Sequence, residues 1–532
     1  MQYVYQKEER MDINLFFQGY DSVNGYQQSI LQDIDDCIHF RRCVVTSRDN
    51  DGKDRYDPGK YVKVDYDMCA NARYEYCMDM NSLLPLDREV LTAMEPYEPT
   101  AVKMLCRITD FDIFTYDEAK RFYLHHLRYW NDIFERNHIN FVFLTGIPHH
   151  THDYIIYALT KVKKIPMCIL APTHLPHWCF VGNDLYRLYE RLDAAYEKRK
   201  KSEEDVILPE DVEDYYQALL RENKQQKMQV MLGSGSKKEH ARKEKRQIMG
   251  YVMREKIIRR QLSRVKHGLA GAVKSRSLSF WKESRLWMKK DTYCIQKVRH
   301  KLKNCMTIED YEKMAVMPDM THEKYVLFLL HLQPEATTLP QAGVFVEQEL
   351  CVQLLASVLK EYNIRLYVKE HFVQPYRMKH FYEDLRGTEN VTLVSSDAES
   401  VDLLAHCVAA ATPAGTVSIE AIANGKPVFV FGHGGFEHGP GIYQVGNEKQ
   451  CREAIEHILK DGHVPTQSVR NYFRAFVESG ICIYSPIEGA DPEKVEQSRR
   501  SVVELAVEEI RRAYTEKFLR KQDKKTRERC NT

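Results

Sequence analysis

Long hydrophobic runs are missing from this chain of 532 residues. Its longest apolar runs, Ile139–Leu144 and Tyr325–Leu330, are much shorter than the roughly 20 residues that a helix needs to cross a bilayer. The first ten residues, MQYVYQKEER, contain no apolar core of a secretory signal peptide. These absences predict a protein that is made and kept in the cytoplasm.

Cysteine motifs for metals or redox chemistry are also missing. The 14 cysteines stand singly, with no Cys-x-x-Cys pair and no Cys/His spacing typical of a metal site. Cys168, Cys351 and Cys407 lie inside apolar stretches, so we predict that they are reduced core residues. No Asp-x-Asp pair stands out as an anchor for a divalent metal. The sequence therefore predicts no bound metal and no cofactor.

Net charge is almost absent, since 77 Lys and Arg residues face 76 Asp and Glu residues. The balance is uneven along the chain. Residues 237–303 carry 22 basic and five acidic residues, and residues 511–532 carry nine basic and three acidic residues. The remainder is therefore strongly acidic. With 43% apolar residues, 24 Gly and 19 Pro, a fibrous or wholly disordered chain is excluded, but a membrane-surface protein is not.

The basic segment 237–303 leaves two interpretations open. It is either a solvated helical hairpin inserted between domains or a surface for anionic membrane lipid, on the inner face of the plasma membrane. The second interpretation is favoured by mixed aromatic and cationic residues, namely Trp281, Lys282, Arg285, Leu286, Trp287, Met288, Lys289 and Lys290. Nucleic-acid binding has the charge but no recognisable reading motif, so we do not predict a nucleic-acid partner.

Residues 1–184 show the pattern of an α/β domain. Ile139–Leu144 is a continuous apolar run, as expected for a parallel strand covered on both faces. A break at Gly146 is followed by an amphipathic helix over His152–Val162 and a further strand over Ile165–Leu170. This strand–loop–helix–strand order is typical of an open parallel sheet.

Residues 321–480 predict a second doubly wound sheet. Four helical patterns, at 347–361, 376–386, 399–405 and 416–424, alternate with five strand patterns. The predicted strands are Tyr325–Leu330, Arg365–Val368, Val391–Val394, Cys407–Ala411 and Pro427–Phe431. We predict a charged helical insertion at 185–320 and a helix with a basic tail at 481–532.

Polar residues follow the strands of the second sheet, where an open parallel sheet binds its ligands. Lys369 and His371 follow one strand, and Gly415 and Thr416 follow another, with Ser418 and Glu420 in the next helical turn. A glycine permits close backbone approach, and N–H, hydroxyl and cationic donors suit a phosphate. Glu420 could accept hydrogen bonds from a ribose. Glu370 is interpreted as pairing with Lys369 or facing solvent. The cluster predicts a nucleotide site.

Four segments resemble bacterial capsular and surface polysaccharide biosynthesis proteins. They are HLQPEATT at 331–338, YVKEH at 367–371, AGTVSIEAIANGKPVFVFG at 414–432 and IPHHTHDYIIYALTKVKKIPM at 147–167. The resemblance implies a glycosyltransferase with two Rossmann-like domains, the GT-B fold. Some relatives transfer Kdo or sialic-acid-type sugars from a CMP-sugar to a growing polysaccharide or lipid acceptor. In them, residues matching Lys369, His371, Thr416 and Ser418 hold the phosphate.

Two positions depart from the family pattern. Phe372 stands where the family usually has Pro, and Ala414 stands where Thr is common. Neither departure removes a group that is expected to contact phosphate.

Glycosyl transfer also needs a base for the acceptor hydroxyl. We expect the base from the first domain, whose loop after Ile139–Leu144 contains His149 and Asp153. Asp21 also qualifies, and Glu335 is a further candidate. A helix-capping role is the alternative for Asp153.

Two other functions are left open by the sequence. Nucleotide-sugar 2-epimerases share the two-Rossmann fold and need no acceptor, although the HLQPE and KEH segments favour the transferase. A non-catalytic scaffold in polysaccharide assembly is the other alternative, and Phe372 is the feature that favours it.

Overall fold

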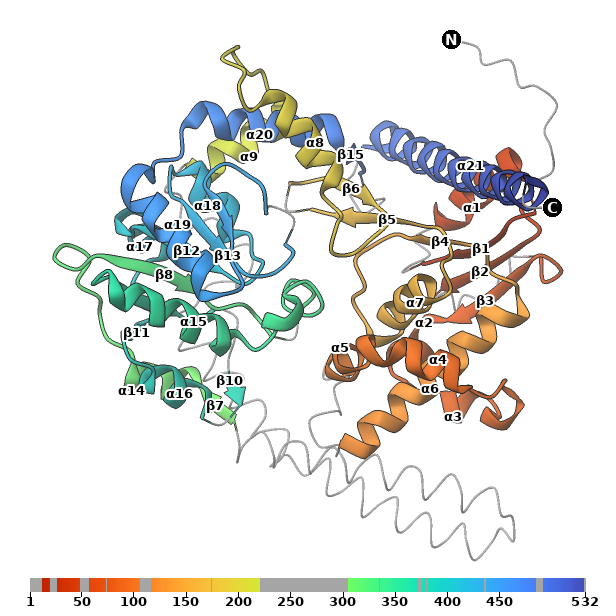
Figure 1. Ribbon diagram of the computed structural model, residues 1–532, viewed down its shortest axis with the longest axis horizontal. Helices are drawn as coiled ribbons and strands as arrows, with labels where there is room; N and C mark the ends of the chain where they lie inside the picture. The colour runs from red at the N-terminus through yellow and green to blue at the C-terminus, as the bar shows by residue number, and fades with distance from the viewer. Residues whose placement is uncertain are drawn as a thin grey trace, which may run out of the picture. The chain divides into compact units, whose positions relative to one another are not determined.

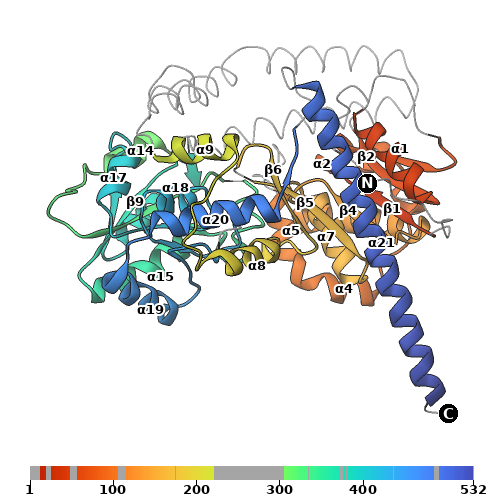
Figure 2. The same ribbon diagram turned by 90° about the horizontal axis from the view of Figure 1, so that it is seen from above.

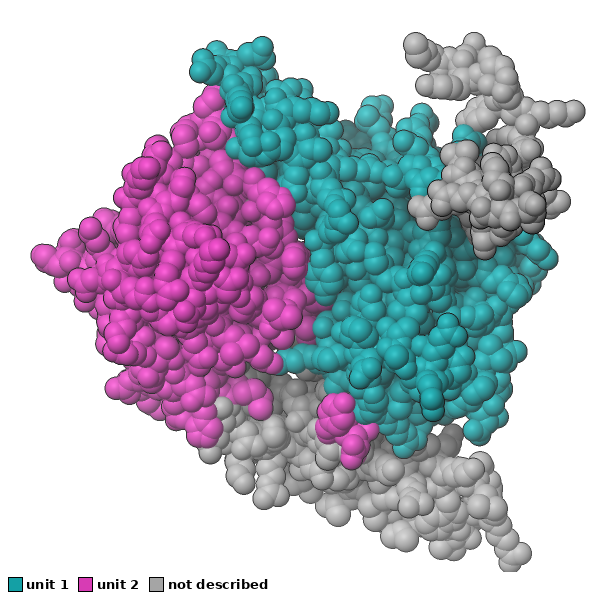
Figure 3. Space-filling view, in the orientation of Figure 1, with its two compact units in different colours: residues 1–105, 120–215, 470–532 teal, residues 106–119, 216–469 magenta. Residues whose placement is uncertain are grey.

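The computed structural model describes residues 12–19, 26–47, 57–72, 74–105, 116–173, 175–220, 305–333, 335–371, 376–378, 380–434, 437–484 and 491–530. The chain forms two compact units, coloured separately in Figure 3. Unit 1 comprises residues 1–105, 120–215 and 470–532, and unit 2 comprises residues 106–119 and 216–469. The predicted basic segment 237–303, Asp21 and Phe372 lie outside the described residues.

Unit 1 is built on a seven-stranded sheet of order β15-β6-β5-β4-β1-β2-β3. The strands from β5 to β3 run parallel, and β6 and β15 join antiparallel to β5 and β6. The strand bounds are β1 Asn14–Phe17, β2 Arg42–Ser47, β3 Tyr61–Asp65, β4 Phe141–Leu144, β5 Met167–Pro172, β6 Trp178–Gly182 and β15 Ile481–Cys482.

Helices cover both faces of this sheet because alternate strand residues are apolar on both sides. Leu15 and Phe17 pack on one face with α1 (Tyr26–Ile38) and α21 (Pro492–Cys530), which Figures 1 and 2 both show side by side. Phe16 faces the other way and contacts Trp130 and Phe134 of α6 (Tyr116–Arg136). Helix α7 (Thr151–Val162) connects β4 to β5.

Unit 2 is built on a six-stranded parallel sheet of order β11-β9-β8-β12-β13-β14. Its strands are β8 Tyr325–Leu329, β9 Arg365–Lys369, β11 Val391–Val394, β12 Ala409–Thr412, β13 Val428–Val430 and β14 Ile442–Gln444. Unit 2 also contains a small antiparallel pair, β7 (Cys305–Thr307) and β10 (Tyr376–Met378). In the chain, β7 precedes β8, and β10 comes between β9 and β11.

The sheet of unit 2 is also covered on both faces. Val326 and Phe328 pack in one core with α15 (Gln348–Glu361) and α19 (Glu448–Asp461). On the other face, the Tyr325 hydroxyl donates to Leu403 O of α17 (Ser400–His406) at 2.7 Å. The predicted pair of doubly wound Rossmann-like domains is therefore confirmed, and so is burial of Cys168, Cys351 and Cys407.

The remaining described elements are mostly short connections. They are α2 Tyr66–Ala70, α3 Tyr74–Cys77, η1 Met80–Ser82, α4 Arg88–Met94, η2 Glu95–Tyr97, α5 Glu98–Met104, α8 Glu190–Arg199, α9 Glu210–Leu220, α14 Ile308–Met314, η5 Gly343–Phe345, α16 Phe381–Gly387, α18 Val417–Ala423 and α20 Thr466–Ser479. None of the helices in the described ranges is both long enough and apolar enough to span a bilayer.

The observed units divide the chain differently from the predicted domains. Residues 185–215 belong to unit 1 and not to an insertion, because α8 packs against β6. Residues 470–532 return to unit 1, where α21 covers α1. Sequence patterns are local, so they did not reveal these returns of the chain to its first sheet.

Candidate functional site

The strand order of unit 2 places a topological switch point between β8 and β12, where open α/β sheets bind ligands. His331 follows β8, and its Nε2 lies 2.6 Å from Thr412 Oγ1 at the end of β12. The His331 backbone is held by Gln348, whose amide accepts from its N–H at 2.7 Å and donates to its carbonyl at 3.1 Å. The two strand ends that flank the switch point are therefore linked directly.

Gly415 lies against this link and has no room for a side chain. A Cβ atom there would come within 2.4 Å of His331 Nε2 and 2.9 Å of Thr412 Oγ1. Its N–H donates to Thr412 Oγ1 at 3.2 Å. The glycine therefore lets the backbone that enters α18 approach the end of β8 closely.

Helix α18 begins without a side-chain cap. Thr416 is its N-cap residue and makes no capping hydrogen bond. Ser418 is 2% exposed, and its hydroxyl donates to Gly415 O at 2.7 Å, so its proton is used inside the turn. Glu420 is half-buried in the same turn. The N–H groups of Ser418, Ile419 and Glu420 already donate to Gly415 O and Thr416 O at 3.0–3.2 Å. An anion at this helix start would therefore meet the Thr416 hydroxyl and the N–H groups of Thr416 and Val417.

Lys369 ends β9, the neighbour of β8, and His371 follows it. Lys369 is the last residue of β9; it is 2% exposed and its Nζ donates to Ser396 O at 3.4 Å. His371 is half-buried, and its backbone N–H donates to Glu370 Oε1 at 2.6 Å. The predicted donor-site residues thus follow β9 and β12, on either side of β8 at one edge of one sheet.

The interpretation of Glu370 was wrong. Glu370 is 3% exposed and pairs with Arg377 instead of Lys369 or solvent. Arg377 Nε and Nη2 donate to its two oxygens at 2.8 and 2.6 Å, and the Tyr382 hydroxyl donates to Oε2 at 2.8 Å. Burial alone would lower the pKa of Arg377, but the charge and hydrogen bonds of Glu370, together with those of Tyr382, outweigh burial and raise the pKa.

Arg377 is a site-edge residue that the sequence did not indicate. It lies in the short strand β10, within a stretch that was predicted to be helical. On a surface helix an arginine is expected to face solvent. Arg377 is placed by the pairing of β10 with β7, which joins residues about 70 positions apart. Such a pairing leaves no local pattern in the sequence, so no sequence signal indicated this residue.

The candidate bases of unit 1 differ in exposure. Asp153 is fully buried, and its two oxygens accept from Gln18 Nε2 at 2.8 Å and from the His150 N–H at 3.0 Å. It closes the capping box of α7. His149 is half-buried in the loop before α7. The structure thus gives Asp153 the capping role that was the alternative, and it leaves the ring of His149 nearer to solvent.

Glu335 lies in unit 2, in the loop after β8. It is half-buried, and its Oε2 accepts from the Thr337 N–H at 3.3 Å. Its carboxylate therefore makes a weaker local contact than that of Asp153.

Buried histidines gather beside the carboxyl end of β4. The His152 ring stacks on Trp130 and His150, with centroid distances of 6.2 and 5.9 Å. His126 is fully buried, and its Nδ1 lies 2.7 Å from the Tyr74 hydroxyl. Burial, followed by the charges of neighbouring histidines, lowers the pKa of His126 well below its ordinary value. No cluster of three or more His, Cys, Asp or Glu among the described residues has the arrangement of a metal site.

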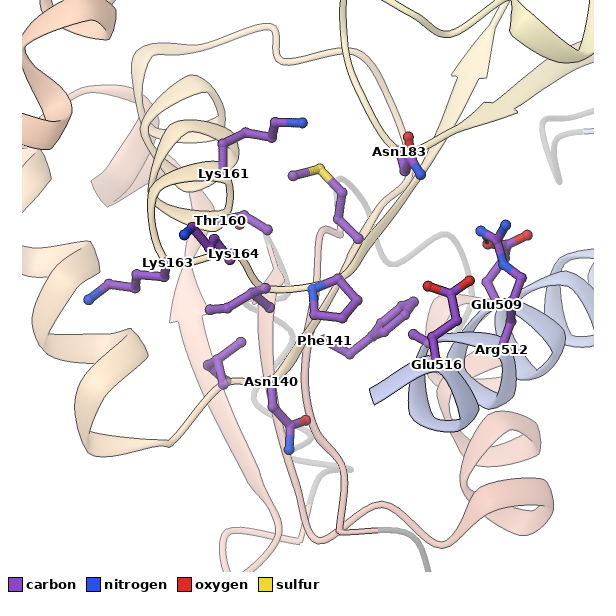
Figure 4. A pocket seen from close by; sticks show the side chains of 15 residues that line it. Asn140, Phe141, Thr160, Lys161, Lys163, Lys164, Asn183, Glu509, Arg512 and Glu516 are labelled. Carbon is purple, nitrogen blue, oxygen red and sulfur yellow. Dashed lines mark hydrogen bonds and ion pairs between the residues drawn. The ribbon is translucent and has the colours of Figure 1, made fainter. Parts of the chain in front are cut away.

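A hollow of about 850 Å³ in unit 1 contains none of the predicted site residues. Figure 4 shows it between the start of β4, the end of α7 and α21. Phe141, Lys164 and Arg512 are among its lining residues. It opens at the edge where β4 and β5 begin, which is opposite to the ligand-binding edge of a parallel sheet.

One protein family matches a large part of this chain. Residues 206–460 match the family model described as capsule polysaccharide biosynthesis protein. This range contains the whole sheet of unit 2 and the segments 331–338, 367–371 and 414–432. It does not contain the segment 147–167, for which the resemblance stays a prediction. No curated protein matches the chain.

Solved structures match at low identity. MnaA of S. aureus, solved with UDP, is 9% identical over 87% of this chain and 94% of that chain, with a TM-score of 0.25. KpsC of Thermosulfurimonas dismutans, titled beta Kdo 2,7 transferase, is 12% identical over 74% and 98%, with a TM-score of 0.28. The UDP-GlcNAc 2-epimerase of Neisseria meningitidis is 11% identical over 88% and 99%, with a TM-score of 0.24. These values assign neither activity nor ligand.

Proposed function

We propose that this chain is a glycosyltransferase of capsule or surface polysaccharide assembly, because residues 206–460 match the model of the capsule polysaccharide biosynthesis proteins. The donor is a nucleotide sugar, bound at the carboxyl edge of the unit 2 sheet. The observation that carries this proposal is the arrangement around the switch point. Lys369 ends β9 and His371 follows it, and the uncapped start of α18 follows β12.

The donor site matches the charge that develops during transfer. When the glycosidic bond of a nucleotide sugar breaks, negative charge grows on the departing phosphate, and positioned donors stabilise it. Lys369 supplies a cationic donor, and the His371 ring and the Thr416 hydroxyl supply further hydrogen-bond donors. We propose a CMP-linked, Kdo-like donor and chemistry without a metal, since these groups suffice to meet the charge.

We propose that either His149 or Glu335 is the base that activates the acceptor hydroxyl. Both are half-buried, whereas both oxygens of Asp153 are used in the capping box of α7. A base must reach the acceptor hydroxyl, so a fully buried and doubly hydrogen-bonded carboxylate is the weaker candidate. The acceptor is proposed to be a growing polysaccharide or a lipid-linked sugar.

The direct test is incubation of the full chain with CMP-Kdo, CMP-sialic acid and UDP-GlcNAc, with and without an oligosaccharide acceptor. Release of CMP that accelerates with acceptor supports the transferase. Conversion of UDP-GlcNAc to its 2-epimer without acceptor would instead support the epimerase. Failure of every donor to react would support a scaffold and contradict the proposal.

Two substitutions address the donor site itself. We expect Lys369→Ala and His371→Ala each to lower the rate of nucleotide release by about 100-fold or more, because removal of one charge-stabilising donor typically has this effect. Circular dichroism and thermal unfolding check that the fold is intact. Full activity in both folded variants would remove Lys369 and His371 from the phosphate site.

A further inference from the structure

Arg377 contacts both loops that follow the central strands of the proposed donor site. Its Nη2 donates to His331 O at 2.8 Å, and its Nη1 donates to Gln333 Oε1 at 3.1 Å, in the loop after β8. Its Nε and Nη2 bind both oxygens of Glu370, directly after β9. One planar side chain therefore spans the ends of two neighbouring strands.

Glu370 links Arg377 to His371 by hydrogen bonds. Its Oε1 accepts the His371 N–H at 2.6 Å in addition to Arg377, and its Oε2 accepts the Tyr382 hydroxyl. The Glu370 N–H in turn donates to the Tyr311 hydroxyl at 3.2 Å. Each carboxylate oxygen thus has two donors, so the carboxylate cannot rotate without breaking hydrogen bonds. The backbone direction of His371 is set by this fixed group.

Because the Arg377–Glu370 pair is buried, it is better explained as a group that fixes geometry than as a source of stability. The side chains of Arg377 and Glu370 are only 2% and 1% exposed. Removing two charges from water offsets most of their attraction, so apolar side chains of similar volume often give equal stability. A guanidinium fork, by contrast, fixes the angle and distance of a carboxylate in a way that an apolar pair cannot.

We propose that Arg377 is a positioning residue of the donor site. Through Glu370 it orients His371 toward the nucleotide phosphate, and through the carbonyl of His331 it fixes the loop that follows β8. This inference rests on the proposed function, because it assumes that a nucleotide binds at this edge.

Unit 2 offers a matched control in Arg452. It also binds a glutamate with two parallel hydrogen bonds, from Nε and Nη2 to Glu361 at 2.9 and 2.7 Å. That pair is exposed, with side chains 37% and 48% accessible, and it links α15 to α19. Arg377→Lys and Arg452→Lys are therefore the same chemical change in a buried and an exposed pair.

The experiment measures CMP and UDP binding to the full chain by isothermal titration calorimetry, well below the unfolding temperature of each variant. We expect Arg377→Lys to raise the Kd of the nucleotide that the wild type binds by about 10- to 100-fold, as for a small misplacement of binding groups. Arg452→Lys should leave that Kd unchanged. Equal affinity of the wild type and a folded Arg377→Lys variant would overturn the proposal.

A double substitution separates positioning from stability. Glu370→Met combined with Arg377→Met replaces the buried ions by apolar groups of similar volume, so we expect thermal unfolding close to that of the wild type. Its affinity for nucleotide should still be as low as that of Arg377→Lys. Wild-type affinity in the double variant would overturn the proposal even if Arg377→Lys does not fold. A wild-type chain that binds neither CMP nor UDP would overturn the proposed function and this inference with it.

Discussion

The two sheets of this protein share a strand order but differ in how their carboxyl edges are finished. In unit 1 the order β3-β2-β1-β4-β5 places a switch point between β1 and β4, and in unit 2 the order β11-β9-β8-β12-β13 places one between β8 and β12. Helix α7 follows β4, and α18 follows β12. The comparison is therefore between two equivalent positions of one topology.

The helix starts at these two positions differ in how their acidic side chains are buried and bonded. The start of α7 contains the buried carboxylate of Asp153, which accepts from the His150 N–H and from Gln18. The start of α18 has no side-chain cap, and its first turn contains the half-buried Glu420. A buried carboxylate at a helix start repels a second anion, and Asp153 is fully buried whereas Glu420 is half-buried. We therefore expect that, of these two edges, the one in unit 2 is better suited to a phosphate.

Of the substitutions that test this comparison, we expect Gly415→Ala to have the largest effect on stability and nucleotide affinity. In Gly415→Ala the new Cβ would come within 2.4 Å of His331 Nε2, so either the His331 ring or the backbone at the start of α18 must move. We expect a loss of stability of about 1–3 kcal/mol from overpacking, and nucleotide affinity about 100-fold lower from misplacement of the phosphate-binding groups. Calorimetric titration with CMP and urea unfolding measure the two effects.

Gly387→Ala is the matched control, since a Cβ at Gly387 meets nothing within 4 Å. It should leave nucleotide affinity unchanged. An unaltered affinity in Gly415→Ala would show that the approach of α18 to β8 plays no part in binding.

A smaller effect is expected at the equivalent helix start of unit 1. Asp153→Ala removes the acceptor for Gln18 and for the His150 N–H, so unit 1 should lose about 1–2 kcal/mol of stability, as for the loss of a helix cap. Asp153→Asn keeps one acceptor oxygen and should lose less. Denaturant unfolding measures both.

The same pair of variants tests the catalytic alternative for Asp153. If Asp153 only caps α7, a folded Asp153→Asn variant keeps most of the wild-type transfer rate. Complete loss of transfer in that folded variant would instead identify Asp153 as the base.

The smallest effect is a pH dependence that belongs to unit 1 alone. Burial lowers the pKa of His126 below its ordinary value of 6.5, so the unfolded chain binds the proton more readily than the folded chain. Stability should therefore fall as the pH drops below about 6.5, by less than about 0.7 kcal/mol between pH 6.5 and 6 for this group.

Urea unfolding at several pH values, followed by tryptophan fluorescence, measures this slope. His126→Asn keeps a polar atom near the Tyr74 hydroxyl and should flatten the slope. An unchanged slope in that variant would assign the pH dependence to other groups.

Most of the strands could be predicted from the sequence because buried parallel strands are local apolar runs. Val391–Val394 was predicted with its observed bounds, and β9 differs from its prediction only by including Lys369. Strands with weaker apolar runs were missed. Tyr61–Asp65 is β3, at the edge of its sheet, and its observed pattern of burial leaves only Val64 buried. Ile442–Gln444 is β14, a short strand at the edge of the other sheet that follows a glycine-rich turn.

The sequence by itself determined the two parallel sheets and the residues that follow their strands, because alternation of strand and helix dictates which ends share an edge. Lys369, His371, Gly415 and Thr416 could be grouped for that reason alone. Only the tertiary structure decided how Glu370 and Asp153 are used. Whether a carboxylate is solvated, paired with Arg377 or held in a helix cap depends on partners distant in sequence. Those partners are brought together by packing, which no local pattern records.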